Sequence, residues 1–511
     1  MALVNLQDPI RRLDRVLLCC SPLPILIVLL NVTRYLLHGP QWLWNEARLA
    51  PAFSMMYGYH LYPGHDTLAP VVGTLHAPVG YILFAGLSFL KDPTIALLAA
   101  CGLATVLYFT PLVWLHLRAG GKKDRLISLY ALLACAAIVV ATPGTSYAAF
   151  SVHVDASATA AAVLAAGLLV VPRADSGGRG GTAALTVSAF LGVLAVGCKQ
   201  IMAPVPVALA LFVLLVEGRR TFARYIVMQA VSALAIAGAL LAIFRPTQDF
   251  LFNTVWLATH RPPFHIANRL AKGMYFERES LAAVIPVLFV LGGKMLWLDS
   301  GSLRARLREN RWLVFALLAA FQVPFSLRAW TTVGGDHNHL AVVTLFGTIA
   351  ATLGLALPWH SGNGVAGDWP ALLRRILPVG IIVAVFPLPW GLKASAERLF
   401  DNHAEVAFRY EKAHPGRAYF PMNPLASLLA EGRLTHFDPS LVDREITGCD
   451  TTPALLAAGL PPHFQLVAWR PDAGGPSSEQ MLLLLQSMTP VREPDLEGWR
   501  VFAWKDGAAP R

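Results

Sequence analysis

The sequence predicts an all-α polytopic membrane protein of about eleven transmembrane helices, followed by a small extracytoplasmic α/β domain. Of its 511 residues, 55% are hydrophobic and only 14% are charged, whereas soluble domains carry about 25% charged residues. Long apolar runs recur along most of the chain, as in a bundle of spanning helices. The net charge of +10 comes mainly from short loops between these runs, which is typical of cytoplasmic loops. Nucleic-acid binding is therefore not predicted.

The first span is expected at about 17–37, and no small-residue cleavage site closes it, so a removed signal peptide is not predicted. The apolar stretch 77–90 would be about 21 Å long as a helix, too short for a hydrocarbon core of roughly 30 Å. Placing it as a helix on the outer surface keeps the basic loops on one side. The other ten spans are expected at about 94–117, 127–143, 156–172, 182–198, 201–216, 225–244, 280–298, 312–328, 340–357 and 375–392.

An odd number of spans places the N-terminus in the cytoplasm and the C-terminus outside, in a multi-pass protein of the cytoplasmic (inner) membrane. Residues 1–392 are the expected transmembrane domain, and 393–511 the extracytoplasmic domain, because charges, Pro and Gly increase after 392. FQLVAWR (464–470) and WRVFAWK (499–505) have the composition of strands. LASLLAEGRL (425–434) predicts a short helix.

Ionisable and polar residues gather in the loops expected at the outer face. Lys199 is the clearest case, because almost no loop separates the apolar runs on either side of it. Charged groups at membrane depth are costly and usually functional. The six cysteines show no metal-ligand spacing and predict no disulfide framework. The candidate site residues are Glu46, Tyr62, His76, Asp155, Lys199, Gln200, Arg261, His265, Arg269, Asp336, His337 and Asn338.

The order of these features resembles that of the GT-C glycosyltransferases, which include the protein O-mannosyltransferases and the bacterial transferases that move aminoarabinose onto lipid A. The resemblance covers roughly 10–390. The first acid of the family's usual pair is Asn45 here, which leaves Glu46 as the carboxylate of that segment. The similar stretches are NEARLAPAFSMMYGYHLYPG (45–64), HAPVGYILFAGLSFL (76–90), VHVDASATA (152–160), GCKQIMAPVPVAL (197–209) and GGDHNHL (334–340).

The resemblance implies transfer of a sugar from a polyprenyl-phosphate-linked donor to a hydroxyl acceptor at the outer face of the membrane. A carboxylate would take the acceptor proton, and cations would stabilise the departing lipid phosphate. We expect Glu46 to be the base and Asp155 to orient the acceptor or bind a metal, or the reverse. Lys199 would bind the donor phosphate. Arg261, His265, Arg269, Gln200, Tyr62, His76, Asp336, His337 and Asn338 are the other expected substrate contacts.

The sequence leaves the sugar, the acceptor, the lipid carrier and the need for a divalent cation open. Simpler roles exist for single residues: Glu46 and Asp155 could cap helices, and Lys199 could mark the membrane edge. A membrane transporter or lipid flippase is one alternative function, although the sequence shows no paired broken helices. A non-catalytic partner in envelope assembly is another. An outer cavity bordered by Glu46, Asp155 and Lys199 would favour transfer.

Overall fold

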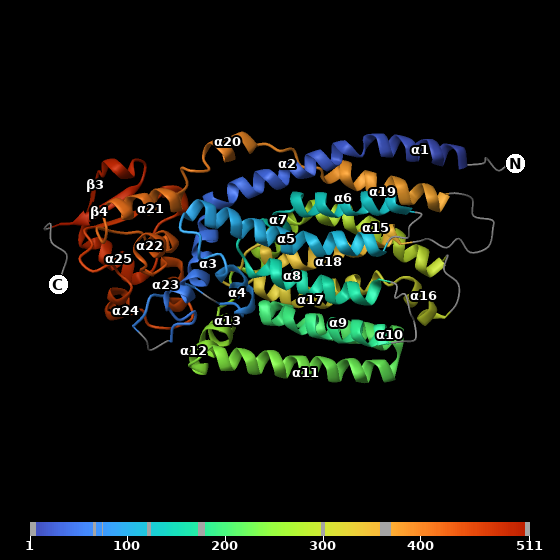
Figure 1. Ribbon diagram of the computed structural model, residues 1–511, viewed down its shortest axis with the longest axis horizontal. Coiled ribbons are helices and arrows are strands. Elements are labelled where there is room, and N and C mark those ends of the chain that lie inside the picture. The colour runs from blue at the N-terminus through green and yellow to red at the C-terminus, as the bar shows by residue number, and fades with distance from the viewer. Residues whose placement is uncertain are drawn as a thin grey trace.

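The protein consists of a long helical bundle with a smaller lobe at one end (Figure 1). The computed structural model describes residues 7–64, 68–73, 75–119, 124–171, 179–297, 302–357 and 369–505. Helix α1 (Gln7–Cys20) begins at the end of the bundle opposite to the lobe, and the described chain ends within the lobe. The first and last described residues therefore lie at opposite ends of the molecule, as an odd number of crossings requires. The basic loops around 120–123 and 172–178 lie outside the described residues.

A helix coincides with each of the eleven expected spans. Eight helical segments of the described chain are long and apolar enough to cross a membrane alone. Helix α6 (Arg125–Ala141) supplies a ninth if it is joined to α7 (Pro143–Phe150), which bends away by 97°. The polytopic fold is thus confirmed, and the number of eleven crossings stays a prediction. The corresponding helices are α1 with α2 (Pro22–His38), α5 (Pro93–Ala119), α6 (Arg125–Ala141), α8 (Val154–Val170), α9 (Arg179–Cys198), α10 (Pro204–Glu217), α11 (Arg219–Ile243), α15 (Arg278–Trp297), α17 (Leu313–Trp330), α18 (Asn338–Ala356) and α19 (Trp369–Val385).

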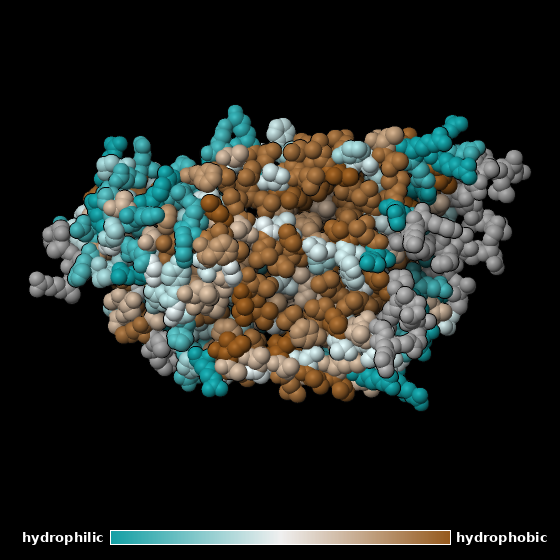
Figure 2. All heavy atoms as spheres, viewed as in Figure 1, coloured by the Kyte–Doolittle hydropathy of each residue, from teal (hydrophilic) through white to brown (hydrophobic). Residues whose placement is uncertain are grey.

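Apolar side chains form a broad belt over the bundle, whereas hydrophilic side chains gather on the lobe and at the opposite end (Figure 2). Such a belt matches the hydrocarbon layer of a bilayer, in which exposed polar groups are costly. The exposed faces of the outer helices are apolar, for example at Val231 and Leu234 of α11. The protein is therefore a multi-pass membrane protein.

Helices α8 and α18 form the centre of the bundle, and nearly all their side chains are buried. Helix α8 is rich in alanine, and small residues let membrane helices approach closely. The N-termini of both helices lie at the end of the bundle that carries the lobe (Figure 1). The polar residues at these N-termini, Asp155 and Asn338, are therefore brought to the same end of the core.

Short elements cover the lobe-facing end of the bundle. The stretch 77–90 forms only a short helix, α4 (Val79–Ala85), so the prediction that it does not span the membrane is confirmed. A Cβ atom on Gly80 would lie 2.5 Å from Cγ1 of Val154, so glycine allows α4 to pack on the start of α8. The other short elements are η1 (Gly39–Gln41), α3 (Leu43–Ser54), η2 (Met55–Tyr57), η4 (Gln200–Met202), α12 (Thr247–Leu251), the π-helical η5 (Phe252–Trp256), α13 (Leu257–Thr259) and α14 (Ile266–Phe276), with α16 (Leu303–Glu309) at the opposite end.

The C-terminal lobe contains a four-stranded sheet of order β1-β2-β4-β3. Strand β1 (Ala418–Tyr419) pairs in parallel with β2 (Leu466–Trp469), and the other pairings are antiparallel. The expected strands are confirmed by β2 and by β4 (Arg500–Trp504), and the expected helix by α22 (Pro424–Glu431). The sequence missed β1 and β3 (Met488–Val491), since a two-residue strand and one containing a proline give little pattern. The remaining elements are α20 (Leu392–Glu397), α21 (His403–Ala413), α23 (Asp438–Glu445), α24 (Pro453–Ala458), η6 (Pro471–Ala473), α25 (Glu479–Gln486) and η7 (Pro494–Leu496).

The lobe has a core of its own and also packs on the bundle. One buried cluster lies within the lobe and includes Phe420, Leu466 and Val501. A second, larger cluster runs from the bundle helices into the lobe, where it includes Tyr419 and Leu425. The lobe is thus fixed against the bundle, and the domain boundary at 392 stays a prediction.

Candidate active site

A cavity of about 650 Å³ lies between the end of the bundle and the lobe. The bundle side contributes Arg48, His76 and Lys199, and the lobe contributes Phe437 and Asp443. This volume is within the range typical of small-molecule sites. The cavity therefore combines surfaces from parts of the chain that are almost 400 residues apart in sequence.

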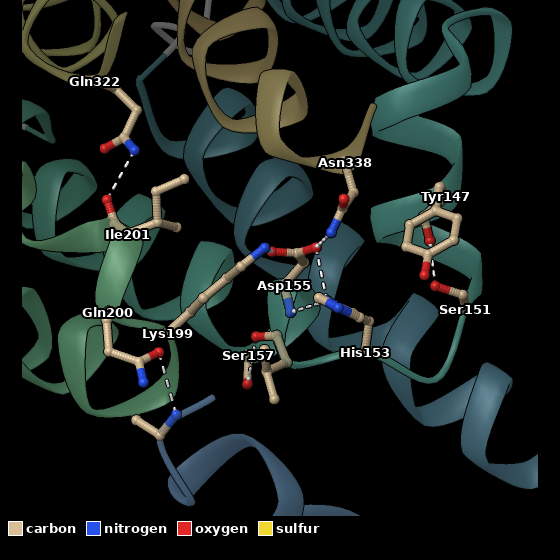
Figure 3. A network of polar contacts seen from close by, with 12 residues as sticks. Tyr147, Ser151, His153, Asp155, Ser157, Lys199, Gln200, Ile201, Gln322 and Asn338 are labelled. Carbon is tan, nitrogen blue, oxygen red and sulfur yellow. Dashed lines mark hydrogen bonds and ion pairs between the residues drawn. The ribbon is translucent and has the colours of Figure 1, made fainter. Parts of the chain in front are cut away.

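Asp155 lies beneath the cavity floor, where its carboxylate contacts Lys199, Asn338 and the N-cap residue of its own helix, His153 (Figure 3). Its Oδ1 accepts a hydrogen bond from Lys199 Nζ at 2.5 Å, and its Oδ2 accepts one from Asn338 Nδ2 at 2.9 Å. His153 Nδ1 lies 2.7 Å from Oδ2. Asp155 itself is fully buried and does not line the cavity. With both oxygens occupied, its carboxylate can hold these three side chains in place and has little capacity to bind a substrate.

Lys199 is held by this carboxylate at the turn between α9 and η4. The lysine is 1% exposed, yet it lines the cavity. A buried charge is tolerated when it is paired and hydrogen-bonded. The ion pair therefore keeps a cation at the cavity floor, at the end of a largely apolar bundle.

Neutral imidazoles surround the ion pair. The rings of His76 and His153 are in edge contact, with centroids 5.1 Å apart. Burial lowers the pKa of His153 to about 4 and that of His76 well below its usual value. His339 also lines the cavity, and none of the described residues forms a hydrogen bond with its buried Nδ1. Among the described residues, no group of three or more His, Cys, Asp or Glu side chains is arranged to hold a metal ion.

Arg48 is a cavity residue that the sequence analysis did not select. Trp44, Ala47 and Arg48 of α3 all line the cavity, which is the spacing of one helical face. The Arg48 guanidinium lies over the rings of Trp44 and Tyr147, and its buried Nη1 has no hydrogen-bond partner within the described part of the chain. Among the described residues it pairs with no carboxylate. The 44, 47, 48 spacing in an amphipathic helix was the signal that could have identified it.

Glu46, the expected base, lies outside the lining of this cavity. It is two residues from both Trp44 and Arg48 and so points roughly 200° away around α3. Its Oε2 accepts a hydrogen bond from Asn423 Nδ2 at 2.7 Å, and its Oε1 accepts one from the Ala426 N–H at 3.1 Å. Glu46 thus accepts hydrogen bonds at the N-terminus of α22 and joins the lobe to α3.

The other expected residues divide into two groups. Gln200 lines the cavity, and its side-chain Nε2 donates hydrogen bonds to the backbone carbonyls of Leu75 and Thr254. Tyr62 donates a hydrogen bond to the His76 carbonyl from outside the lining. Those that line the cavity are His76, Lys199, Gln200, Arg261, Asp336 and Asn338, whereas Tyr62, His265, Arg269 and His337 do not.

Three of these non-lining residues have structural contacts. Arg269 donates to the Gly335 carbonyl at 2.8 Å and lies over the Trp330 ring. His265 is exposed and packs edge-on against Phe264. His337 Nδ1 lies 2.5 Å from Asp336 Oδ1. The structure therefore places these three side chains in loop packing next to the cavity.

The roof of the cavity is an ion pair between Arg261 and Asp443 of α23. Arg261 Nη1 also lies 3.5 Å from the Val333 carbonyl. Gly334 has φ +74°, and a Cβ atom there would lie 2.6 Å from Arg261 Nη1, so glycine suits this position in both conformation and space. Arg261 thus connects two outer loops of the bundle to the lobe.

A second set of contacts holds the first outer loop against the start of α23. The Val71 N–H donates to His436 Nδ1 at 2.8 Å, and the Phe437 N–H donates to the Val71 carbonyl at 3.0 Å. The Gly73 N–H donates to Ser440 Oγ at 2.6 Å. The cavity is therefore bounded by fixed segments of both parts of the protein.

The chain shares its fold with membrane proteins of known structure. Two crystal structures of ArnT from Cupriavidus metallidurans share it. The form bound to undecaprenyl phosphate matches with a TM-score of 0.58 and 12% identity, over 96% of this chain and 99% of that one. The apo form gives a TM-score of 0.57 and 13% identity, over 96% and 100%.

A weaker similarity is found to the oligosaccharyltransferase of Archaeoglobus fulgidus in the apo form. The TM-score is 0.43 at 12% identity, over 85% of this chain and 60% of that one. The sequence itself matches no protein-family model and no curated protein at a significant level.

Proposed function

We propose that this protein transfers a sugar from a polyprenyl-phosphate-linked donor to a hydroxyl acceptor. The observation that carries the proposal is the cavity at one end of the apolar bundle, with a buried Lys199 at its floor and an unneutralised Arg48 beside it. A lipid-linked donor needs a site where the membrane meets an enclosed polar chamber. The fold shared with ArnT, which was crystallised with undecaprenyl phosphate, agrees with such a donor.

The donor phosphate is assigned to Arg48 and Lys199. The unpartnered Nη1 of Arg48 is buried, and such a group is costly unless a ligand supplies an acceptor. A guanidinium suits a phosphate because it offers parallel N–H donors. As the bond from the sugar to the phosphate breaks, negative charge grows on the leaving phosphate. Fixed cations in a poorly hydrated cavity stabilise that charge.

The lipid tail is assigned to the membrane side of the cavity. Ile201, Ala258 and Phe325 are apolar lining residues from η4, α13 and α17. Phe325 is 47% exposed, although a phenylalanine side chain prefers burial in an apolar environment. A polyprenyl chain lying along these residues would place its phosphate towards Lys199.

The lobe and cavity are assigned to the outer face of the cytoplasmic membrane. The opposite end of the bundle carries many arginines, and positive loops favour the cytoplasm. A reporter inserted after Gly218 should therefore be cytoplasmic, and one inserted after Leu392 external. The reverse pattern would contradict this orientation. The arginines at that end include Arg11, Arg12, Arg15, Arg118, Arg125, Arg220, Arg304, Arg308 and Arg374.

The function is tested by measuring liberated polyprenyl phosphate. Full-length protein in proteoliposomes would receive synthetic polyprenyl-phosphate hexoses or pentoses, with membrane fractions as the source of acceptor. Arg48→Gln should weaken donor binding about 10- to 100-fold, since a hydrogen bond to a charged group contributes about 1.5–3 kcal/mol. Arg409→Gln is the matched control, because Arg409 is an exposed arginine of the lobe.

Two results would contradict the proposal. One is an unchanged donor affinity in Arg48→Gln, which would remove Arg48 from the phosphate site. The other is movement of the lipid between leaflets with no liberated polyprenyl phosphate from any donor. That second result would favour the alternative of a lipid flippase.

A further inference from the structure

Glu46 is turned away from the cavity and Asp155 is saturated, so the question is which group takes the acceptor proton. Among the described residues, two carboxylates line the cavity, Asp336 and Asp443. The two carboxylates differ in their hydrogen-bond and ion-pair partners. Asp336 is bonded through Oδ1 to both the backbone N–H and the ring of His337. Asp443 is bonded through Oδ1 to Arg261.

Asp336 is the weaker candidate for a base. Burial alone would raise its pKa, but the hydrogen bonds and charge of His337 lower it to about 2. A general base works best when its pKa is near the operating pH. A carboxylate with so low a pKa accepts a proton poorly, and the Asp336 side chain is also half exposed.

Asp443 has the geometry of an oriented base. The arginine clamps one oxygen, and no described residue donates a hydrogen bond to Oδ2. The Asp443 side chain is 26% exposed and lines the cavity. Burial raises its pKa, and Arg261 partly offsets that rise. One oxygen is therefore fixed in direction while the other remains free to accept a proton.

Asp443 lines the same cavity as the proposed phosphate site, because the faces of α23 and α3 that carry these residues border it together. Pro439, Asp443 and Ile446 line the cavity at helical spacing, so one face of α23 forms its wall. At the start of α23, the ring of Phe437 meets that of Trp44 edge-on, with centroids 5.4 Å apart. Trp44 lies on the same face of α3 as Arg48. The faces of α3 and α23 that line the cavity are therefore in contact.

We propose that Asp443 of the C-terminal lobe is the catalytic base and that Arg261 is its positioning residue. This role rests on the proposed sugar transfer. The acceptor oxygen forms a bond to the anomeric carbon of the donor sugar. The bond from that carbon to the phosphate oxygen breaks, and its electron pair leaves with the polyprenyl phosphate. The acceptor proton moves to Oδ2 of Asp443 and is released to water after the product leaves.

The assignment gives the lobe a direct part in the chemistry. The bundle would hold the donor phosphate at Arg48 and Lys199, and the lobe would activate the acceptor from the opposite wall. The acceptor is then a molecule whose hydroxyl reaches the cavity along α23, next to Ser440 and the Trp44–Phe437 pair.

Three variants test the role in the proteoliposome assay described above. Asp443→Asn keeps the shape and should lower kcat about 10²- to 10⁴-fold, the usual contribution of a positioned base, with the donor KM unchanged. Asp443→Ala should lose turnover and recover part of it when formate is added, because formate can enter the space and accept the proton. Asp450→Asn is the control, an exposed acid of the lobe whose turnover should match wild type.

The outcomes separate this role from the proposed function. If wild type liberates polyprenyl phosphate and Asp443→Asn does so equally fast, Asp443 is not the base although the protein is a transferase. Asp443 is also not the base if Asp443→Asn is slow but Asp443→Ala stays inactive when formate is added. This conclusion requires that Asp443→Ala has the melting temperature of wild type. If wild type liberates nothing from any donor, the proposed function fails and the role of Asp443 fails with it.

Discussion

The floor and the roof of the cavity each contain a carboxylate paired with a cation, but the two pairs are built differently. At the floor, Asp155 uses both oxygens to bind Lys199, Asn338 and His153. At the roof, Asp443 lines the cavity and uses one oxygen to bind Arg261, and no described residue donates a hydrogen bond to its other oxygen. The floor pair comes wholly from the bundle, and the roof pair joins the bundle to the lobe.

This difference indicates that a carboxylate's place in the sequence says little about its chemical role. Asp155 stands at the start of an expected span, yet both of its oxygens are occupied, so it anchors the lysine that we propose binds the donor phosphate. Asp443 stands in a region of ordinary soluble character, yet its half-free carboxylate can accept a proton. Breaking each pair should therefore produce different defects.

The largest loss of stability and turnover is expected from Asp155→Asn. The substitution leaves the charge of Lys199 buried without its counter-charge, and breaking a buried pair costs about 3–5 kcal/mol. We expect a strongly lowered melting temperature, little folded protein and no turnover. Differential scanning fluorimetry in detergent would measure the loss.

The double variant Asp155→Asn with Lys199→Met is the control for this effect. It removes both charges, so it should regain much of the melting temperature without regaining turnover. If Asp155→Asn alone melts like wild type, the floor pair does not carry the structural role assigned to it.

A smaller loss of kcat/KM, which depends on pH, is expected from Arg261→Gln. Arg261 lowers the pKa of Asp443, so its removal should raise that pKa, and an opposite charge at this distance shifts a carboxylate by about 1–3 pH units. The base must be deprotonated to act, so the acidic limb of kcat/KM should move to higher pH. Turnover should be lost most at low pH and recover as the pH rises.

Arg261→Lys keeps the charge and should shift the pH profile less. The measurement is kcat/KM for liberated polyprenyl phosphate from pH 5 to pH 9. An equal loss at every pH would show that Arg261 supports the loops without setting the state of Asp443.

The smallest effect on turnover is expected from Glu46→Gln, since Glu46 caps α22 outside the cavity. Burial raises its pKa from 4.5 to about 8, against the hydrogen bonds from Asn423 and Ala426. The folded protein thus keeps a proton that the unfolded chain releases as the pH rises from about 4.5 to 8. The stability contributed by Glu46 is full below this interval and lost as the pH rises through it.

Glu46→Gln has no proton to lose, so its melting temperature should fall less than that of wild type between pH 5 and pH 8. Part of the slope should remain, because burial also raises the pKa of the neighbouring Glu411. Turnover at the assay pH should equal that of wild type. A large loss of turnover at an unchanged melting temperature would return Glu46 to the active site.

The sequence predicted the fold better than the site. Apolar runs mark the helices of the bundle because burial in a bilayer imposes a long, continuous pattern. The same pattern predicted that Lys199, Gln200 and Asn338 lie at one end of the spans, and these residues line the cavity. Strand β1 was missed because it is two residues long and defined by its partner.

The sequence could not predict which side chains of the outer loops face inward. Glu46 and Arg48 are two residues apart, and only the helical conformation of α3 places them on different faces. Asp443 becomes part of the cavity through the docking of the lobe, which depends on contacts such as Glu46 with α22. Contacts of this kind leave no periodic signal in the sequence.

The most direct test of the account is a structure of the full chain with undecaprenyl phosphate bound, determined by electron cryo-microscopy. The account predicts phosphate density in the cavity, within hydrogen-bonding reach of the Arg48 guanidinium and Lys199 Nζ. The lipid tail should leave past Phe325 and Ile201, and Oδ2 of Asp443 should face the phosphate across an acceptor-sized space. Phosphate density away from Arg48 and Lys199, or a passage open to both ends of the bundle, would contradict it.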